Sequence, residues 1–221
     1  IKFAANNWDA LTKFDASGST GNITADLSVA TTAGKLLKTV VGGTGGDVFT
    51  VDVGNGVAAV NVNTGAGNDV LTLKASATIA DADATITLGA GKDTLTIGAA
   101  GGLANITATP TTVAELTAKI VTVTDFKAAE DVLSIKAATP VVFDAAQVAL
   151  IAGQADLLAA TKKAAELAGT RKTVVFGFGT DSYIYQNDGD AAVDGGDGLV
   201  KLTGVNVNDF NSAFNGNLVV A

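Results

Sequence analysis

A five-residue phrase recurs four times along the chain, and it constrains the fold more than any other feature. The phrase reads Asp, any residue, apolar, hydroxyl, apolar, and it begins at Asp47, Asp69, Asp93 and Asp131. Apolar residues that alternate at period two are typical of a strand with one buried face. Repetition then predicts two inward columns of side chains. The first column holds Phe49, Leu71, Leu95 and Leu133, and the second holds Val51, Leu73, Ile97 and Ile135.

Each of the first three phrases follows a glycine-rich loop, at residues 42–47, 64–69 and 88–93. Short alternating segments, 60–62 and 86–88, precede the second and third loops. The Asp residues that end the three loops are 22 and then 24 residues apart. This spacing predicts coils that each hold two strands, one glycine loop and one ordinary turn, with the first ordinary turn at residues 54–56.

Stacked coils would place these loops along one edge, about 4.7–4.9 Å apart. Glycine allows left-handed backbone and turns carbonyl oxygens inward, and each Asp adds a carboxylate. Neighbouring loops would then form oxygen cages suited to calcium, two cages for three loops, and without a cation the carboxylates would repel. The candidate ligands here are Gly43, Gly45, Asp47, Gly65, Gly67, Asn68, Asp69, Gly89, Gly91 and Asp93. A metal-free solenoid with tight turns would explain the glycines, but not an Asp at the sixth position of all three loops.

The composition agrees with hard oxygen ligands. Of the 22 acidic residues, Glu115, Glu130 and Glu166 are the glutamates and all others are Asp, which favours turns and metal loops. The formal net charge of -8 argues against nucleic-acid binding. The chain has no Cys, His or Met, so a Ser-His-Asp triad and a Cys- or His-ligated metal cannot be built within it. We therefore expect calcium as the cofactor, no catalytic residue and no enzyme activity, and no apolar run is long enough to span a membrane.

Residues 42–50 resemble the nonapeptide of the RTX (repeats-in-toxin) family, a calcium-binding β-helix repeat. The match is complete in this loop, whereas Thr64 and Leu88 replace the first glycine in the next two loops. The spacing also departs from strict nine-residue repetition. The resemblance implies an all-β dominated fold, a right-handed parallel β-roll or β-solenoid with calcium loops mainly on one edge.

Further segments extend the resemblance. Residues 121–133 resemble the segment that closes RTX arrays, which adds Asp125 and Asp131 to the candidate ligands. Residues 183–190 and 199–210 resemble the C-terminal end of such proteins, and the apolar tail 214–221 is similar to an uncleaved secretion signal. Residues 14–24 resemble coils that are common in RTX-bearing surface-layer proteins and large adhesins.

Together these parts look most like the C-terminal region of a bacterial S-layer protein that is exported by type I secretion. The family implies a secreted, extracellular location at the cell surface, and folding and assembly on calcium binding. It implies self-association into a lattice, contact with the type I secretion machinery and, as a further partner, cell-surface polysaccharide. Two alternatives stay open, the secretion module of an exported protease or lipase, and the end of a large adhesin. Neither HExxH nor GxSxG occurs, and the start at Ile1 without Met suggests a piece of something longer.

We predict a division into a β-roll at residues 1–136 and a second part at residues 137–221, a helical insertion followed by a β segment. Residues 143–169 have helical composition, with Asp144 as N-cap, Gly169 as the stop and a break at Gly153. A short helix is predicted within 111–120. These helices are expected to cover the roll and its edge strands.

Two further features have alternative interpretations. The acidic stretch 187–198, with Asp188 and Asp190, is either another calcium loop or a solvated hairpin loop between strands at residues 183–185 and 199–202. Trp8 is either a packed cap near the chain start or a binding aromatic, and packing is the expectation for a lone Trp.

Overall fold

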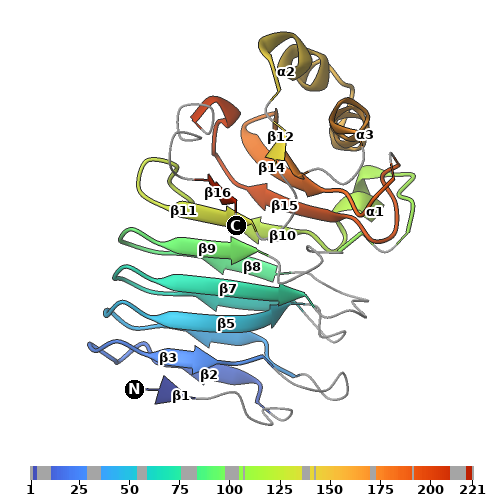
Figure 1. Cartoon of the computed structure of the whole chain (residues 1–221). Helices are drawn as coiled ribbons and strands as arrows, with labels where there is room; N and C mark the ends of the chain where they lie inside the picture. The colour runs from blue at the N-terminus through green and yellow to red at the C-terminus, as the bar shows by residue number, and fades with distance from the viewer. Residues whose placement is uncertain are drawn as a thin grey trace.

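The chain folds into a parallel β-roll whose successive strands alternate between two sheets (Figure 1). The structure is a computed structural model. It describes residues 2–3, 11–28, 36–53, 59–75, 84–97, 105–106, 108–135, 140–141, 143–169, 173–190, 192–209 and 218–220. The predicted fold class is thereby confirmed. The predicted turn at 54–56 and Trp8 lie outside the described residues.

The first sheet, sheet A, is parallel throughout, and each coil adds one strand to it. Its order within the described residues is β1 (Lys2–Phe3), β3 (Thr24–Asp26), β5 (Val48–Val53), β7 (Val70–Ala75), β9 (Thr94–Ile97), β11 (Val132–Ile135) and β16 (Leu218–Val220). The apolar tail of the chain thus pairs with β11 as the last strand, through Leu218 opposite Leu133.

Sheet B runs parallel along the coils and ends in an antiparallel extension. Its described order is β12 (Pro140–Val141), β13 (Thr173–Phe178), β14 (Asp181–Gln186), β15 (Gly198–Leu202), β10 (Val121–Val123), β8 (Ala84–Thr87), β6 (Val60–Asn63), β4 (Thr39–Val41) and β2 (Lys13–Asp15). The strands β13, β14 and β15 are antiparallel neighbours, while β15 pairs parallel with β10. Both sheets therefore continue across the predicted division at residue 136.

The register confirms the inward columns that the repeat predicts. Phe49 pairs with Leu71, Leu71 with Leu95 and Leu95 with Leu133, and all four side chains are fully buried. The second column follows the same register from Val51 to Ile135. The facing column comes from sheet B, where Val40, Val62, Ile86 and Val123 are buried. The core of the roll is thus a stack of aliphatic layers, one layer to each coil.

The helices form where the sequence predicts them. The helix α1 (Val113–Thr117) has Thr112 as N-cap, α2 (Ala145–Ala152) has Asp144, and α3 (Leu157–Ala168) has Asp156. Gly153 ends α2, and Gly169 ends α3 with a φ of 71°. Gly153 therefore divides the helical stretch in two, as predicted.

The helices α2 and α3 pack on β13, beyond the last coil rather than along the roll (Figure 1). A second apolar cluster lies at this end, where α3 buries Leu157, Leu158 and Ala165 in the same cluster as Phe176 and Tyr185. The helices α2 and α3 thus cover the antiparallel extension at the end of sheet B. In the described part of the chain, no helix is both long enough and apolar enough to cross a membrane.

Candidate metal-binding edge

The glycine loops lie one above another along one edge of the roll, between a strand of sheet B and the next strand of sheet A (Figure 1). Main-chain hydrogen bonds join them, since Ala66 donates to the Gly43 carbonyl over 2.9 Å and Ala90 to the Gly65 carbonyl over 3.1 Å. Gly89 has a φ of 94°, and a Cβ there would overlap the Gly65 carbonyl. Close stacking of the loops therefore requires glycine at this position.

A ladder of Asp side chains runs through the same edge. Oδ1 of each Asp accepts the backbone N–H of the Asp one coil earlier: Asp69 from Asp47 over 2.7 Å, Asp93 from Asp69 over 2.9 Å, and Asp131 from Asp93 over 3.0 Å. At the first rung, Asp47 Oδ1 accepts from Ile23 over 2.9 Å. All four carboxylates of the ladder are at most 2% exposed. The Asp of the repeat thus links each coil to the preceding one through a backbone hydrogen bond.

The second oxygens of the ladder are in two different environments. Asp47 Oδ2 accepts from Gly43 N and Asp131 Oδ2 from Lys127 N, each over 2.8 Å. Asp69 Oδ2 and Asp93 Oδ2 are buried and have no hydrogen-bond partner within the described structure. A buried carboxylate oxygen without a donor costs free energy, so these two atoms require an explanation.

Burial also changes the acidity of these two groups. It raises the pKa of Asp69 to about 6, and the Asp93 and Asp47 carboxylates raise it further, while the hydrogen bond from Asp47 N acts against this. The Thr64 hydroxyl gives its single proton to the Leu88 carbonyl, 2.5 Å away, so Asp69 Oδ2 receives none. Burial likewise raises the pKa of Asp93, and Asp131 and Asp125 contribute in the same direction. The expected repulsion along the carboxylate stack is therefore present.

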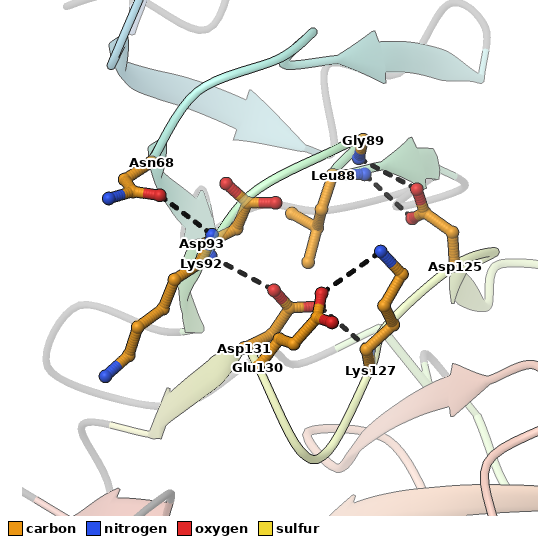
Figure 2. A network of polar contacts seen from close by, with 9 residues as sticks. All are labelled: Asn68, Leu88, Gly89, Lys92, Asp93, Asp125, Lys127, Glu130 and Asp131. Carbon is orange, nitrogen blue, oxygen red and sulfur yellow. Dashed lines mark hydrogen bonds and ion pairs between the residues drawn. The ribbon is translucent and has the colours of Figure 1, made fainter.

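The closing segment between β10 and β11 caps the last glycine loop, and Figure 2 shows it from close by. The Asp125 carboxylate accepts from Leu88 N and Gly89 N, each over 2.8 Å, so both of its oxygens are occupied by backbone donors. In the same view the Asp93 carboxylate lies inside the loop that runs from Leu88 to Asp93. Among the predicted ligands, Asp125 therefore acts as a backbone cap in this structure.

Other predicted ligands on this edge are also engaged in stacking. Asn68 Oδ1 accepts from Lys92 N over 2.9 Å. The carbonyl oxygens of Gly45 and Gly67 lie against the next loop, because a Cβ at Gly67 or at Gly91 would overlap them. Each such carbonyl keeps a second lone pair for a cation.

The acidic stretch at residues 187–198 comprises the loop between β14 and β15 and the first residue of β15, and it gathers three carboxylates. One oxygen each from Asp188, Asp190 and Asp194 lies within 4.8 Å of the others. Burial raises the pKa of Asp194, and the charges of Asp190 and Asp188 raise it further. The sequence predicted Asp188 and Asp190, whereas Asp194 lay unassigned in the same stretch. The strand patterns on either side of this stretch indicate a hairpin loop, in which Asp194 can return to the carboxylates of Asp188 and Asp190.

Buried Asp197 organises this acidic loop. It accepts from Asp188 N over 2.9 Å and from Asp194 N over 3.0 Å, and the Tyr185 hydroxyl donates to it. A Cβ at Gly196 would overlap Asp188 Oδ2, so the carboxylate lies directly over the glycine. The hydrogen bonds of Asp197 thus fix the backbone that carries the three outer carboxylates.

The donor set of the glycine edge fits calcium. It offers two buried carboxylate oxygens that no donor among the described residues reaches, together with carbonyl oxygens between stacked loops and glycines that leave no room for a Cβ. Calcium takes six to eight oxygen ligands, and carboxylates and carbonyls are the usual ones. Residues Asp69 and Asp93 would hold such an ion.

Comparison with known proteins gives a distant likeness. No protein-family model matches the chain, and no curated protein matches it. A similar solved structure is the solution structure of the AlgE6R3 subunit of the mannuronan C5-epimerase from Azotobacter vinelandii. The identity is 18% and the TM-score 0.42, and the match covers 82% of this chain and 77% of that chain. The fold assignment rests on the strand order and register of this chain.

Proposed function

We propose that this chain is a calcium-binding β-roll module of the RTX type, part of a secreted bacterial surface-layer protein that folds and assembles outside the cell. The observation that carries the proposal is the pair of buried oxygens, Asp69 Oδ2 and Asp93 Oδ2, for which the described structure offers no donor. A divalent cation would neutralise both carboxylates and remove their mutual repulsion. Binding to the folded state alone then stabilises the fold by mass action.

The proposed role couples folding to the calcium concentration. At low calcium, repulsion along the acidic ladder lowers the stability of the roll, which raises the fraction of unfolded chain that a type I exporter can pass. Outside the cell, calcium binds to the glycine loops, neutralises the carboxylates and stabilises the folded roll. The tail that ends in β16 would act as the secretion signal while it is unfolded, and would then pair with β11 as the last strand of sheet A.

Calcium dependence is tested on the purified chain by circular dichroism and thermal melting, in chelator, in millimolar calcium and in millimolar magnesium. We expect calcium to raise the melting temperature and the β signal, with a smaller effect of magnesium, which demands octahedral geometry. An unchanged melting temperature between chelator and calcium would overturn the proposal.

Assembly and export are tested separately. The chain is expected to form ordered oligomers or sheets in calcium and to remain monomeric in chelator, as measured by light scattering and electron microscopy. Deletion of residues 214–221 is expected to block secretion in a type I export assay. Monomers at every calcium concentration would instead favour the secretion module of an exported enzyme.

A further inference from the structure

The four rungs of the Asp ladder are chemically unequal, although the sequence presents them as copies. At its two ends, Asp47 and Asp131 have both carboxylate oxygens bonded to backbone N–H groups. In the middle, Asp69 and Asp93 have one bonded oxygen each, and the other is buried without a partner in the described part of the chain.

The difference arises from one glycine in each loop. Gly43 directs its N–H at Asp47, the acid of its own loop. Gly65 and Gly89, one coil and two coils later, have φ values of 103° and 94°. Their N–H groups bond instead to Asn63 Oδ1 over 3.0 Å and to Asp125 Oδ2 over 2.8 Å. The middle loops therefore turn their own donor away from the carboxylate that it would satisfy.

This arrangement reverses the order of calcium affinity that the completeness of the glycine pattern would predict for the loops. The loop at 42–47 has the complete glycine pattern, yet its Asp47 is already satisfied by protein donors. A cation there would share Asp47 Oδ2 with the N–H of Gly43 instead of meeting an oxygen without a donor. In the loops at 64–69 and 88–93, Thr64 and Leu88 replace the first glycine. Each of these loops has a carboxylate oxygen that no donor among the described residues occupies, so a cation would meet no competing hydrogen bond there.

We infer that calcium binds at the two middle loops through Asp69 and Asp93, and that Asp47 and its glycine loop form a metal-independent end cap of the array. The inference rests on the proposed function, because it assigns ligands within the same edge. It predicts opposite effects of one substitution, Asp to Asn, at neighbouring rungs.

The variants Asp69→Asn and Asp93→Asn remove a buried charge but keep the Oδ1 acceptor. In chelator their melting temperatures are expected to rise above that of the wild type, while calcium affinity falls at least about tenfold, or one site is lost. Asp47→Asn places an amide against the Gly43 N–H, so its melting temperature in chelator is expected to fall. Its calcium affinity is expected to stay within about threefold of the wild type.

Isothermal titration with calcium chloride measures affinity and stoichiometry on the full chain, after circular dichroism has verified folding. If Asp47→Asn does not fold, Asp131→Asn repeats the test at the other end of the ladder. A wild type that binds no calcium would overturn the proposed function. A wild type that binds, with Asp47→Asn weakened as much as Asp69→Asn, would overturn the inference alone. A lower melting temperature of Asp69→Asn in chelator would also overturn it.

Discussion

The Tyr185 hydroxyl donates a 2.6 Å hydrogen bond to Oδ2 of Asp197, and both side chains are fully buried. This bond joins β14 to the base of the acidic loop, since Asp197 also accepts from Asp188 N and Asp194 N. Burial and the Asp197 charge raise the pKa of Tyr185 above its usual range, which keeps the phenol protonated as a donor. The acidic loop is therefore held by β14 of the antiparallel extension and also by main-chain hydrogen bonds to Ile106, in the segment between β9 and β10.

Tyr185→Phe is expected to destabilise the fold by about 1–3 kcal/mol, because it leaves a buried carboxylate oxygen short of its donor. Tyr183→Phe is the matched control on the same strand, where the ring stacks on Phe176 and the substitution preserves that ring. Urea denaturation measures both variants. Equal losses would show that the Tyr185 bond adds little beyond the packing of the ring.

A second prediction separates backbone strain from loop stacking. Gly89 and Gly179 both have positive φ, 94° and 63°. Among the described residues, a Cβ at Gly179 meets nothing within 4 Å, whereas a Cβ at Gly89 overlaps the Gly65 carbonyl. Gly179→Ala is expected to cost about 1–2 kcal/mol, from left-handed backbone alone. Gly89→Ala is expected to cost about 3 kcal/mol or more, as a severe steric defect. Similar costs in thermal denaturation would mean that the loops are not tightly stacked.

The repeat predicted the roll because its period of two and its spacing are local signals that every coil reinforces. Phe49 and Leu71 stack as expected, since a register shift by one residue would turn both outward. Helix boundaries were also predictable, because Asp144 and Gly169 cap by short-range rules.

The hydrogen-bond partners of each carboxylate in the ladder could not be predicted from the sequence. Asp47 and Asp69 occupy the same motif position, but their environments differ through the peptide orientation at Gly43 and Gly65. That orientation depends on partners in other coils, such as Asp125, which is 36 residues from Gly89. The hairpin of β14 and β15 was one of the two interpretations of the acidic stretch, but its junction with the roll was not predictable, since β15 pairs with β10 across a long insertion.

Asn105 provides a third prediction, because it pins the connection between α1 and β15. Its side chain donates to the carbonyls of Lys119 over 3.0 Å and Leu199 over 2.7 Å, and it accepts from Leu199 N over 2.7 Å. Asn105→Ala would leave these backbone groups without their partner, at an expected cost of about 2–3 kcal/mol. Asn61→Ala, at an exposed position on β6, is the control and should lie within about 0.5 kcal/mol of the wild type. A loss no larger than that of Asn61→Ala would mean that water replaces the Asn105 side chain.

The last prediction concerns acid stability at the ion pair of Asp181 and Lys201, whose charged atoms lie 2.8 Å apart. Burial by itself would raise the pKa of Asp181, but hydrogen bonds from Lys201 and Gly204 N hold it below its usual value of 3.8. A carboxyl with a lowered pKa stabilises the fold above its unfolded-state pKa, and this stabilisation is lost as the pH falls through the folded-state pKa.

Asp181→Asn removes the charge and keeps the acceptor for Gly204 N. At pH 7 it is expected to cost about 1 kcal/mol, because the pair is partly exposed to solvent. The difference from the wild type should stay constant from pH 7 to about pH 4 and then shrink as the wild-type carboxyl becomes protonated. Lys201→Gln should show the same decline at acid pH, because it breaks the same pair. A stability difference that remained constant down to pH about 2.5 would mean that the cost of Asp181→Asn arises from packing and not from the ionised carboxylate.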